Sequence, residues 1–203
     1  MFMTNINLKI KTKTQNYSIL IGANLTKNIS NILKKNSIKF TKCLIVVDKN
    51  VPKEIISSIK KSLNSKNIYI FFFKANENNK SLKITNQILE ILLKRNFSRD
   101  DCIISIGGGI TGDVTGFAAS QFKRGMKFVN IPTTLLSQVD SCVGGKTGVN
   151  TKYGKNLIGS FYQPNLVISD IEFLKTLPKR EITCGYGEIL KHAIISNRNF
   201  YNF

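Results

Sequence analysis

The chain has 203 residues, enough for one good-sized domain or for one domain and a piece of another. A hydrophobic fraction of 42% is ordinary for a globular protein and excludes a disordered one. The net charge of +18 reflects 30 basic against 12 acidic residues, but the basic residues are scattered and form no stripe or arm. Since clustering gives a basic patch its field, we expect no nucleic acid partner, although an anionic small-molecule substrate would benefit from the excess.

The four cysteines indicate neither a metal motif nor a disulfide framework, because they lie far apart at Cys43, Cys102, Cys142 and Cys184. We find no secretory signal, and no apolar run approaches the roughly 18 residues of a membrane-spanning helix. We therefore expect a cytoplasmic protein with reduced thiols and no membrane partner.

Apolar runs alternate with segments of helical periodicity along the chain. The residues predict a hairpin at 5–10 and 17–21, a strand at 43–48, a helix at 51–63, a strand at 68–73, a helix at 81–96, and strands at 102–106 and 126–132. Strands that alternate with such helices predict a parallel sheet flanked by helices, and near-continuous apolar strands indicate burial on both faces. The predicted fold class is α/β, with a Rossmann-like parallel sheet domain.

A glycine-rich loop follows the strand at 102–106, within IISIGGGITGDVTGFAASQFKRG (103–125). Ligands of open α/β sheets bind at the carboxyl ends of the strands, where this loop lies. Glycine has no Cβ, so backbone N–H groups can approach a phosphate and the loop can adopt positive φ. The spacing GGGITGD differs from the GxGxxG fingerprint, so this segment alone leaves open both phosphate binding and a tight turn that leads into a packed helix.

Polar and glycine-rich residues continue in NIPTTLLSQVDSCVGGKTGVNTKYGKNLIGSFYQP (130–164). The segment contains Thr133, Thr134, Asp140, Lys146, Lys155 and Asn156. Lysine ammonium groups together with hydroxyl and amide donors make a good anion site. The segment therefore favours an anion site over a solvated loop.

These motifs closely resemble those of the 3-dehydroquinate synthase family. The resemblance runs from about residue 40 to the last residue and is densest in GGGITGDVTGFAAS, PTTLLSQVDSCVGGKTGVN, GKNLIGSFYQP, LKTLPKRE and GYGEILKHAII. Several long motifs in the same order are more specific than any one of them. Two of them, VDSCVGGKTGVN and GKNLIGSFYQP, look more like this family than like its glycerol-dehydrogenase and aminocyclitol-cyclase relatives.

The resemblance implies an NAD-binding α/β domain over residues 1–178 and, over 179–203, the first helix of a truncated helical domain for metal and substrate. The implied NAD contacts are Asp48, Glu77, Lys80, Gly108, Gly109, Gly112, Asp113, Thr133, Thr134, Lys146, Lys155, Phe173, Leu174, Lys175 and Thr176. Where the family reads Asp-Gly-Glu-Gln-Tyr-Lys, this chain reads ANENNK (75–80), which keeps Glu77 and Lys80 but lacks the leading Asp-Gly and the Tyr.

The implied catalytic and substrate contacts are Asp140, Lys146, Asn156, Lys191 and Arg124. Of these, Arg124 is expected to reach the phosphate site of a neighbouring subunit. Glu188 matches the family's metal-binding glutamate, for zinc or cobalt. His192, the one histidine, lies four residues after Glu188, so both face one side of a helix and could share a metal. Since the family takes its two metal histidines from a later motif, we interpret His192 as a packing or hydrogen-bonding residue.

The implied reaction converts the sugar-acid phosphate 3-deoxy-D-arabino-heptulosonate 7-phosphate into 3-dehydroquinate and phosphate. This is a lyase step of the shikimate pathway to aromatic amino acids, and it implies catalytic NAD, a divalent metal and a homodimer of the full-length protein. The family's later metal histidines do not occur by Phe203, so we expect a fragment or a natural truncation that is inactive alone. The apolar face of EILKHAII (188–195) is then expected to be exposed.

Two alternative functions remain open. One is an NAD- and metal-dependent polyol dehydrogenase of the glycerol type, which would accumulate NADH. The other is a non-catalytic NAD-binding remnant, which would bind the cofactor without turnover.

Overall fold

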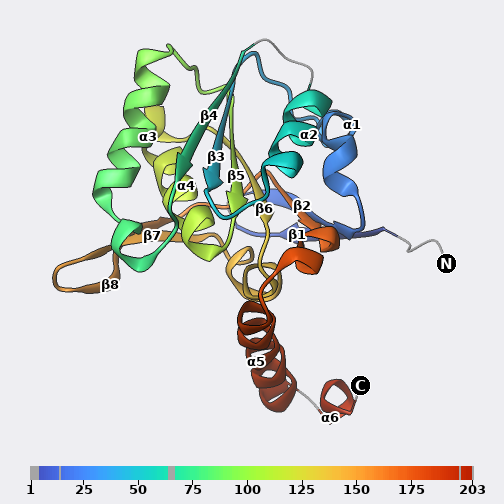
Figure 1. Cartoon of the computed structure of the whole chain (residues 1–203). Helices are drawn as coiled ribbons and strands as arrows, with labels where there is room; N and C mark the ends of the chain where they lie inside the picture. The colour runs from blue at the N-terminus through green and yellow to red at the C-terminus, as the bar shows by residue number, and fades with distance from the viewer. Residues whose placement is uncertain (1–4, 14, 64–66, 197, 203) are drawn as a thin grey trace.

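A seven-stranded sheet forms the centre of the computed structural model, which describes residues 5–13, 15–63, 67–196 and 198–202 (Figure 1). The strand order is β1-β2-β9-β6-β5-β3-β4, and every neighbouring pair is parallel except β1 with β2. The strands are β1 (Ile6–Lys11), β2 (Asn16–Gly22), β3 (Cys43–Asp48), β4 (Ile68–Phe73), β5 (Cys102–Gly107), β6 (Lys127–Pro132) and β9 (Leu166–Asp170). The outer ends of the two predicted domains, residues 1 and 203, lie outside the described residues.

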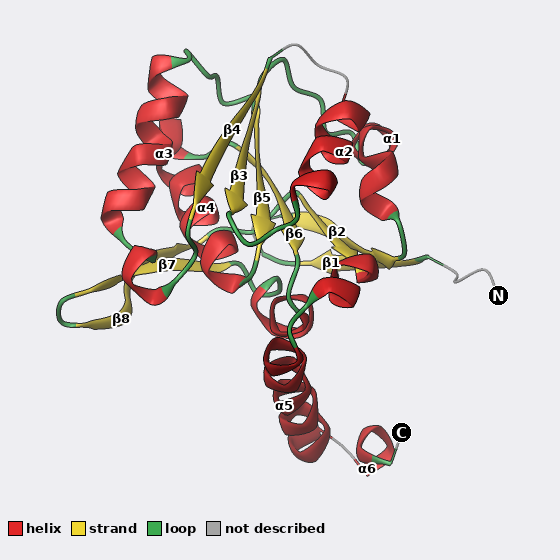
Figure 2. Cartoon of the chain, viewed as in Figure 1, coloured by secondary structure: helices red, strands yellow, loops and turns green. Residues whose placement is uncertain are grey.

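The sheet is buried on both faces because its central strands are apolar along their length. All of β5 and β9, and all of β3 except its last residue, are buried. One core cluster fills the face covered by α1 (Ile29–Lys35) and α2 (Lys53–Leu63), and another fills the face covered by α3 (Leu82–Lys94) and α4 (Gly109–Gln121) (Figure 2). The architecture is therefore a three-layer α/β sandwich.

The order of the strands places a reversal of connection direction between β3 and β5. The chain leaves β3 through α2 toward β4 at one edge of the sheet, and it leaves β5 through α4 toward β6 on the other side. Adjacent parallel strands whose connections depart in opposite directions form a topological switch point, where ligands of such sheets bind.

A two-stranded hairpin and a long helix extend from this sandwich (Figure 1). The hairpin consists of β7 (Lys146–Thr151) and β8 (Gly154–Phe161), and it packs against α4. A Cβ added to Gly116 of α4 would lie 2.6 Å from Thr147 Cγ2 of β7, so the close approach of helix and hairpin requires glycine. Further helical segments are η1 (Leu25–Asn28), η2 (Glu77–Asn79), η3 (Phe122–Arg124), the π-helix η4 (Ser137–Ser141), η5 (Ile171–Thr176), α5 (Lys179–Ser196) and α6 (Arg198–Tyr201).

Helix α5 projects away from the sheet (Figure 1). Much of its apolar surface is exposed. Its buried residues are Gly185 and Ala193, whereas Leu190, Ile194 and Ile195 are exposed. The expected exposure of the apolar face of EILKHAII is thus confirmed. In the described part of the chain, no helix is long and apolar enough to span a membrane.

The predicted α/β fold and each predicted strand and helix are confirmed, with small differences at the ends. The helix predicted over 51–63 begins at Lys53, and the helix predicted over 81–96 ends at Lys94. The second helix stops there because Asn96 adopts a left-handed conformation with φ of 51°. The hairpin β7–β8, the strand β9 and the π-helix η4 are elements that the sequence pattern did not predict.

Asp101 ties the beginning of β5 to the segment that precedes β3. Its buried carboxylate accepts hydrogen bonds from the backbone N–H of Ser98 at 2.7 Å and of Lys42 at 2.8 Å, and from the Thr41 hydroxyl at 2.7 Å. Burial alone would raise the pKa of Asp101, but these hydrogen bonds outweigh it and lower the pKa.

We expect Asp101→Asn to lower the free energy of unfolding by about 2 kcal/mol at pH 7, because an amide cannot accept all of these bonds. Since the pKa of Asp101 is lower in the folded protein, its stabilisation is present at neutral pH and is lost as the pH falls below about 4. Denaturant unfolding at pH 7 and pH 3 measures both effects. Asp100→Asn is the control, since Asp100 is exposed, and equal losses in the two variants would contradict the assignment.

Candidate functional site

The carboxyl ends of the parallel strands bring several polar segments to one edge of the sheet. Strand β3 ends at Asp48, β5 at Gly107, β6 at Pro132 and β9 at Asp170. Because β5 lies between β3 and β6, the glycine loop after it occupies the middle of this edge. The loop therefore lies at the topological switch point of the fold.

The glycine loop leads directly into α4 and leaves the beginning of that helix without a side-chain cap. Gly108 is the N-cap residue and α4 begins at Gly109. A Cβ added to Gly109 would lie 2.9 Å from Ser141 Oγ, and one added to Gly108 would lie 3.2 Å from Thr134 Cγ2. The expected use of positive φ is wrong here, since Gly108 has φ of −74°. Glycine is needed because a neighbouring segment passes close by, not because of an unusual backbone angle.

Ordered turns flank the glycine loop on both sides. On one side, the Thr133 N–H donates to Gly107 O at 2.9 Å, and the Thr134 N–H donates to Ser137 Oγ at 3.1 Å. On the other side, Asp48 accepts from the Ala75 N–H at 3.4 Å. The Thr133 bond joins the segment after β6 to the end of β5, and the Asp48 bond joins the end of β3 to the segment after β4.

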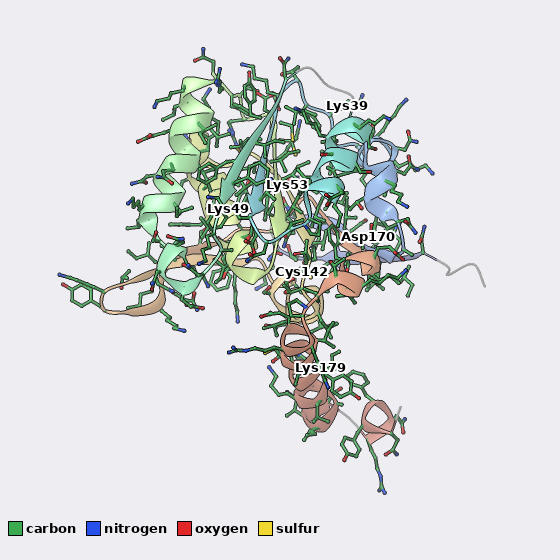
Figure 3. The ribbon with its side chains drawn as sticks, viewed as in Figure 1. Lys39, Lys49, Lys53, Cys142, Asp170 and Lys179 are labelled. Atoms are coloured by element: carbon green, nitrogen blue, oxygen red, sulfur yellow. The ribbon has the colours of Figure 1, made fainter. Side chains whose placement is uncertain are left out.

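The segment after β9 is fixed by a buried carboxylate at the same edge (Figure 3). Asp170 is the N-cap residue of η5 and accepts from the N–H of Glu172 at 3.1 Å. It also accepts from the N–H and the hydroxyl of Thr26 at 2.9 and 2.7 Å. Cys142, also labelled in Figure 3, follows η4 and is buried, and burial raises the pKa of its thiol to about 12. This cysteine is therefore a packing residue at neutral pH.

A cleft of about 640 Å³ opens beside the glycine loop, between α4, η4 and the hairpin. Most of the predicted substrate contacts line it. Its polar lining includes Asp113, Asp140, Ser141, Lys146, Thr147, Asn156 and Ser160, and its apolar lining includes Val143, Leu157 and Phe161. Acidic, basic and amide groups thus share one cavity of a size suited to a small molecule.

Lys80 is buried at the margin of this cleft and joins its own segment, which follows η2, to α4 and β8. Its Nζ lies 2.5 Å from Asp113 Oδ2 of α4 and 2.5 Å from Asn156 Oδ1 of β8. Burial raises the pKa of Asp113, while the hydrogen bond and the charge of Lys80 act in the opposite direction. Asn156 adopts a left-handed conformation with φ of 57°, which directs its amide to this ammonium.

Asn150 supports this arrangement from the hairpin. Its Nδ2 donates to Glu77 Oε2 at 2.8 Å, and its Oδ1 accepts from the Asn156 N–H at 3.1 Å. The hydrogen bond from Asn150 lowers the pKa of Glu77, with a further contribution from Lys155 at 3.4 Å. The sequence interpretation missed Asn150, because an asparagine in GVNT carries no signal until its partners are known.

A third group of polar side chains lies where α5 meets η4. The ligand atoms of Asp140, Glu188 and His192 lie within 4.8 Å of one another. His192 Nε2 lies 3.1 Å from Glu188 Oε1, and the ammonium of Lys191 contacts the same oxygen. The hydrogen bond from Lys191 lowers the pKa of Glu188, which keeps its carboxylate ionised. Two carboxylates and an imidazole are donors that fit a divalent metal.

Comparison with known proteins places this geometry in a family. The family model for the 3-dehydroquinate synthase N-terminal domain matches residues 70–184. The chain belongs to this family. A 3-dehydroquinate synthase of Pelagibacter ubique (strain HTCC1062) is 64% identical over 198 residues, which is 98% of this chain and 54% of that protein. The chain thus spans about half the length of the curated relatives that it matches.

Two solved structures of other synthases share the fold of this chain. A 2-deoxy-scyllo-inosose synthase, complexed with carbaglucose-6-phosphate, NAD+ and Co2+, superposes with a TM-score of 0.87 at 27% identity, covering 95% of this chain and 52% of that one. A 2-epi-5-epi-valiolone synthase from Streptomyces hygroscopicus subsp. jinggangensis 5008, with NAD+ and Zn2+ bound, gives a TM-score of 0.80 at 26% identity, covering 94% and 52%.

The residues implied by the 3-dehydroquinate synthase resemblance fall into separate groups. Asp140 lines the cleft with Lys146 and Asn156, and it also lies beside Glu188. The predicted cofactor residue Lys80 contacts both the predicted cofactor residue Asp113 and the predicted substrate residue Asn156, so the two predicted sets meet at Lys80.

Other implied residues lie outside the cleft. Lys155 and Glu77 line a separate shallow depression. Arg124 lies in a left-handed turn with φ of 65°, where it borders a third depression together with Arg99 and Tyr162. Within a single chain, therefore, Arg124 is not part of the cleft lining.

We expect Lys80→Gln to raise the pKa of Asp113 further, because the substitution removes an ammonium group 2.5 Å from a mostly buried carboxylate. Carboxyl carbon NMR of the labelled chain across pH 3 to 9 measures this shift. Lys155→Gln is the matched control, since Lys155 pairs with Glu77 and should change the pKa of Glu77 instead. An unchanged Asp113 pKa in Lys80→Gln would show that the pair does not form in solution.

Proposed function

We propose that this chain forms the NAD-binding half of a 3-dehydroquinate synthase. The whole protein then converts 3-deoxy-D-arabino-heptulosonate 7-phosphate into 3-dehydroquinate and phosphate. The observation that carries the proposal is the cleft in which Asp113, Asp140 and Asn156 face Lys146, between the glycine loop and Glu188. A substrate with hydroxyl groups and a phosphate needs both hydrogen-bond acceptors and basic groups, and this lining offers both.

The glycine loop fits the pyrophosphate of NAD. No side chain caps the beginning of α4. A phosphate there would gain backbone hydrogen bonds and the favourable helix dipole. The buried Thr111 hydroxyl beside Gly107 has no hydrogen-bond partner among the described residues, as expected of a group that a cofactor satisfies. Asp48 at the end of β3 is assigned to the adenosine ribose, and Thr133, Thr134 and the segment 173–176 to the opposite wall. NAD, when bound, supplies hydride transfer, and these residues set its position.

The donors at the junction of η4 and α5 fit a divalent metal such as the Co2+ and Zn2+ of the two structural relatives. Glu188 is assigned as a ligand. When bound, a metal here supplies Lewis acidity toward a substrate hydroxyl. Lys191 lies three residues after Glu188 on the same face of α5. It is assigned to stabilise negative charge on the substrate.

The substrate is held by groups on the cleft walls. Lys146 and Asn156 are assigned to its phosphate, because an ammonium group and an amide N–H₂ both donate to phosphate oxygens. Asp140 is assigned to a ring hydroxyl, as an acceptor between the cleft and Glu188. Arg124 borders a depression outside the cleft of its own chain, which favours a role toward a second subunit of a homodimer.

The domain division follows from the same assignment. Residues 1–178 form the cofactor domain, and α5 begins a helical domain that completes the substrate and metal sites. The exposed Leu190, Ile194 and Ile195 on α5 support this division, since apolar residues at helical spacing usually face another helix. We propose that the complete enzyme acts in the cytoplasm.

A hybrid enzyme tests the proposed function. Residues 1–203 are joined to the part of the Pelagibacter ubique synthase that follows the matched region, since 64% identity keeps the surfaces between the halves similar. We expect the hybrid to release one phosphate per 3-dehydroquinate formed, with no net NADH, and Asp113→Asn in the hybrid to reduce this turnover. Net NADH from polyols would instead indicate a dehydrogenase, and NAD binding without any product would indicate a non-catalytic remnant.

We expect Gly109→Val to weaken NAD binding to the 203-residue chain by about tenfold or more, because a side chain here collides with Ser141 and blocks the N–H groups of α4. Calorimetric titration with NAD measures the affinity. Gly187→Val is the matched control, since a Cβ at Gly187 meets no atom within 4 Å. Equal NAD affinity in the two variants would show that the glycine loop is not part of the cofactor site.

A further inference from the structure

One side chain of the hairpin contacts both the cofactor group and the substrate group of residues. Asn150 donates from Nδ2 to Glu77, and its Oδ1 accepts from the backbone N–H of Asn156. We propose that Asn150 is a positioning residue that fixes Glu77 and Asn156 relative to each other, and thereby fixes bound NAD relative to the substrate phosphate. The inference rests on the proposed function. It extends that function to a residue that lines the neighbouring depression rather than the cleft.

The backbone of β7 is irregular at Asn150. Strand β7 pairs with β8 as far as Val149, and the register shifts between Val149 and Thr151. Asn150 instead forms a bridge with Ser81, and its N–H donates to Lys80 O at 2.8 Å. Such irregularities are frequent next to active sites, where they redirect a side chain. The irregularity at Asn150 therefore joins the hairpin to the segment that follows η2.

The two ends of the Asn150 amide bind different elements. Its Nδ2 donates to Glu77 Oε2 at 2.8 Å and to Glu77 O at 3.2 Å, which holds both the side chain and the backbone at the beginning of η2. Its Oδ1 accepts from the Asn156 N–H of β8 at 3.1 Å. An ionised carboxylate of the same length could only accept hydrogen bonds. This pair of bonds therefore requires asparagine rather than aspartate.

Asn156 depends on external partners because of its backbone conformation. Its φ of 57° is left-handed, and a residue other than glycine keeps such a conformation only where its surroundings hold it. The bond from its N–H to Asn150 holds the backbone, and the contact of its Oδ1 with Lys80 Nζ at 2.5 Å holds the side chain. Because the Lys80 carbonyl oxygen is itself bound to Asn150, the three residues form a closed circuit. Loss of the Asn150 amide would release Asn156 from it.

Glu77 depends on Asn150 more than on the basic residues near it. The hydrogen bond from Asn150 makes the largest contribution to the lowered pKa of Glu77, ahead of Lys155 at 3.4 Å. Glu77 is exposed, and exposed ion pairs hold a side chain only weakly. The amide of Asn150 therefore keeps this carboxylate ionised and in place.

The 203-residue chain tests the cofactor side of the proposal. We expect Asn150→Ala to weaken NAD binding by about tenfold, because Glu77 loses the bonds that hold it, and to raise the pKa of Glu77 toward its ordinary value. Calorimetric titration with NAD and carboxyl carbon NMR measure the two effects. Asn78→Ala is the matched control, since Asn78 is exposed in the same helix η2. An Asn150→Ala chain that binds NAD as tightly as the control would overturn the proposal.

The hybrid enzyme separates the two ends of the amide. Asn150→Asp keeps an acceptor for the Asn156 N–H, but its carboxylate repels that of Glu77. We expect it to raise the KM for NAD about tenfold and the KM for the keto-acid phosphate by less than about threefold, whereas Asn150→Ala raises both about tenfold. A merely structural role would lower kcat through the folded fraction and leave both KM values unchanged. That result, or an equal rise of both KM values in Asn150→Asp, would refute the assignment, and circular dichroism verifies folding.

The outcomes separate this inference from the proposed function. Turnover by the hybrid enzyme, with both KM values unchanged in Asn150→Ala, would keep the synthase activity and reject the positioning role. Weaker NAD binding and a raised Glu77 pKa in the 203-residue Asn150→Ala chain, without turnover by the parent hybrid, would keep the positioning of Glu77 and reject the synthase activity.

Discussion

The cleft depends on one buried ammonium group. Lys80 Nζ contacts Asp113 of α4 and Asn156 of β8, and the Lys80 carbonyl oxygen accepts a hydrogen bond from the Asn150 N–H of β7 at 2.8 Å. A two-stranded hairpin is marginally stable by itself, so β7 and β8 need these attachments to keep their position. The loss of one partner of a buried charge typically costs about 3–5 kcal/mol, because the remaining charge stays uncompensated. The same contact therefore stabilises the walls of the cleft and sets the charge within it.

Close packing around α4 is the second requirement, and it explains the small residues of the motif. A Cβ at Gly109 would lie 2.9 Å from Ser141 Oγ, and one at Gly116 would lie 2.6 Å from Thr147 Cγ2, so both would force a neighbour to move. A Cβ at Gly112 would make a tight contact of 3.3 Å with Asn130. One face of α4 thus contacts the end of the sheet, η4 and the hairpin in succession. A motif that reads as a phosphate loop is equally a packing surface, and both uses demand glycine at neighbouring positions.

The sheet and its helices could be predicted because their signals lie within short windows of sequence. The run CLIVVD becomes a strand buried on both faces, and the helical spacing of Ile84, Ile88 and Leu92 becomes the buried stripe of α3. The hairpin could not be predicted in this way, since β8 is exposed along most of its length and has no apolar alternation. The burial of Lys80 could not be predicted from the sequence either. Lysine is ordinarily exposed, and the two partners of Lys80 lie 33 and 76 residues away in the sequence. Family motifs named the residues of the cleft, but only the fold brought Lys80, Asp113 and Asn156 together.

The attachment of α5 has a mechanical consequence. This helix meets the sandwich chiefly where Gly185 presses on Leu135 and Leu136, one turn before Glu188. Because α5 is held near one end, a small rotation of the helix about Gly185 would move Glu188 and His192 together relative to Asp140. Any element that packs on the exposed far end of α5 would transmit its own displacement to that junction. Such a displacement would change the distances between Asp140 and the two side chains of α5, Glu188 and His192.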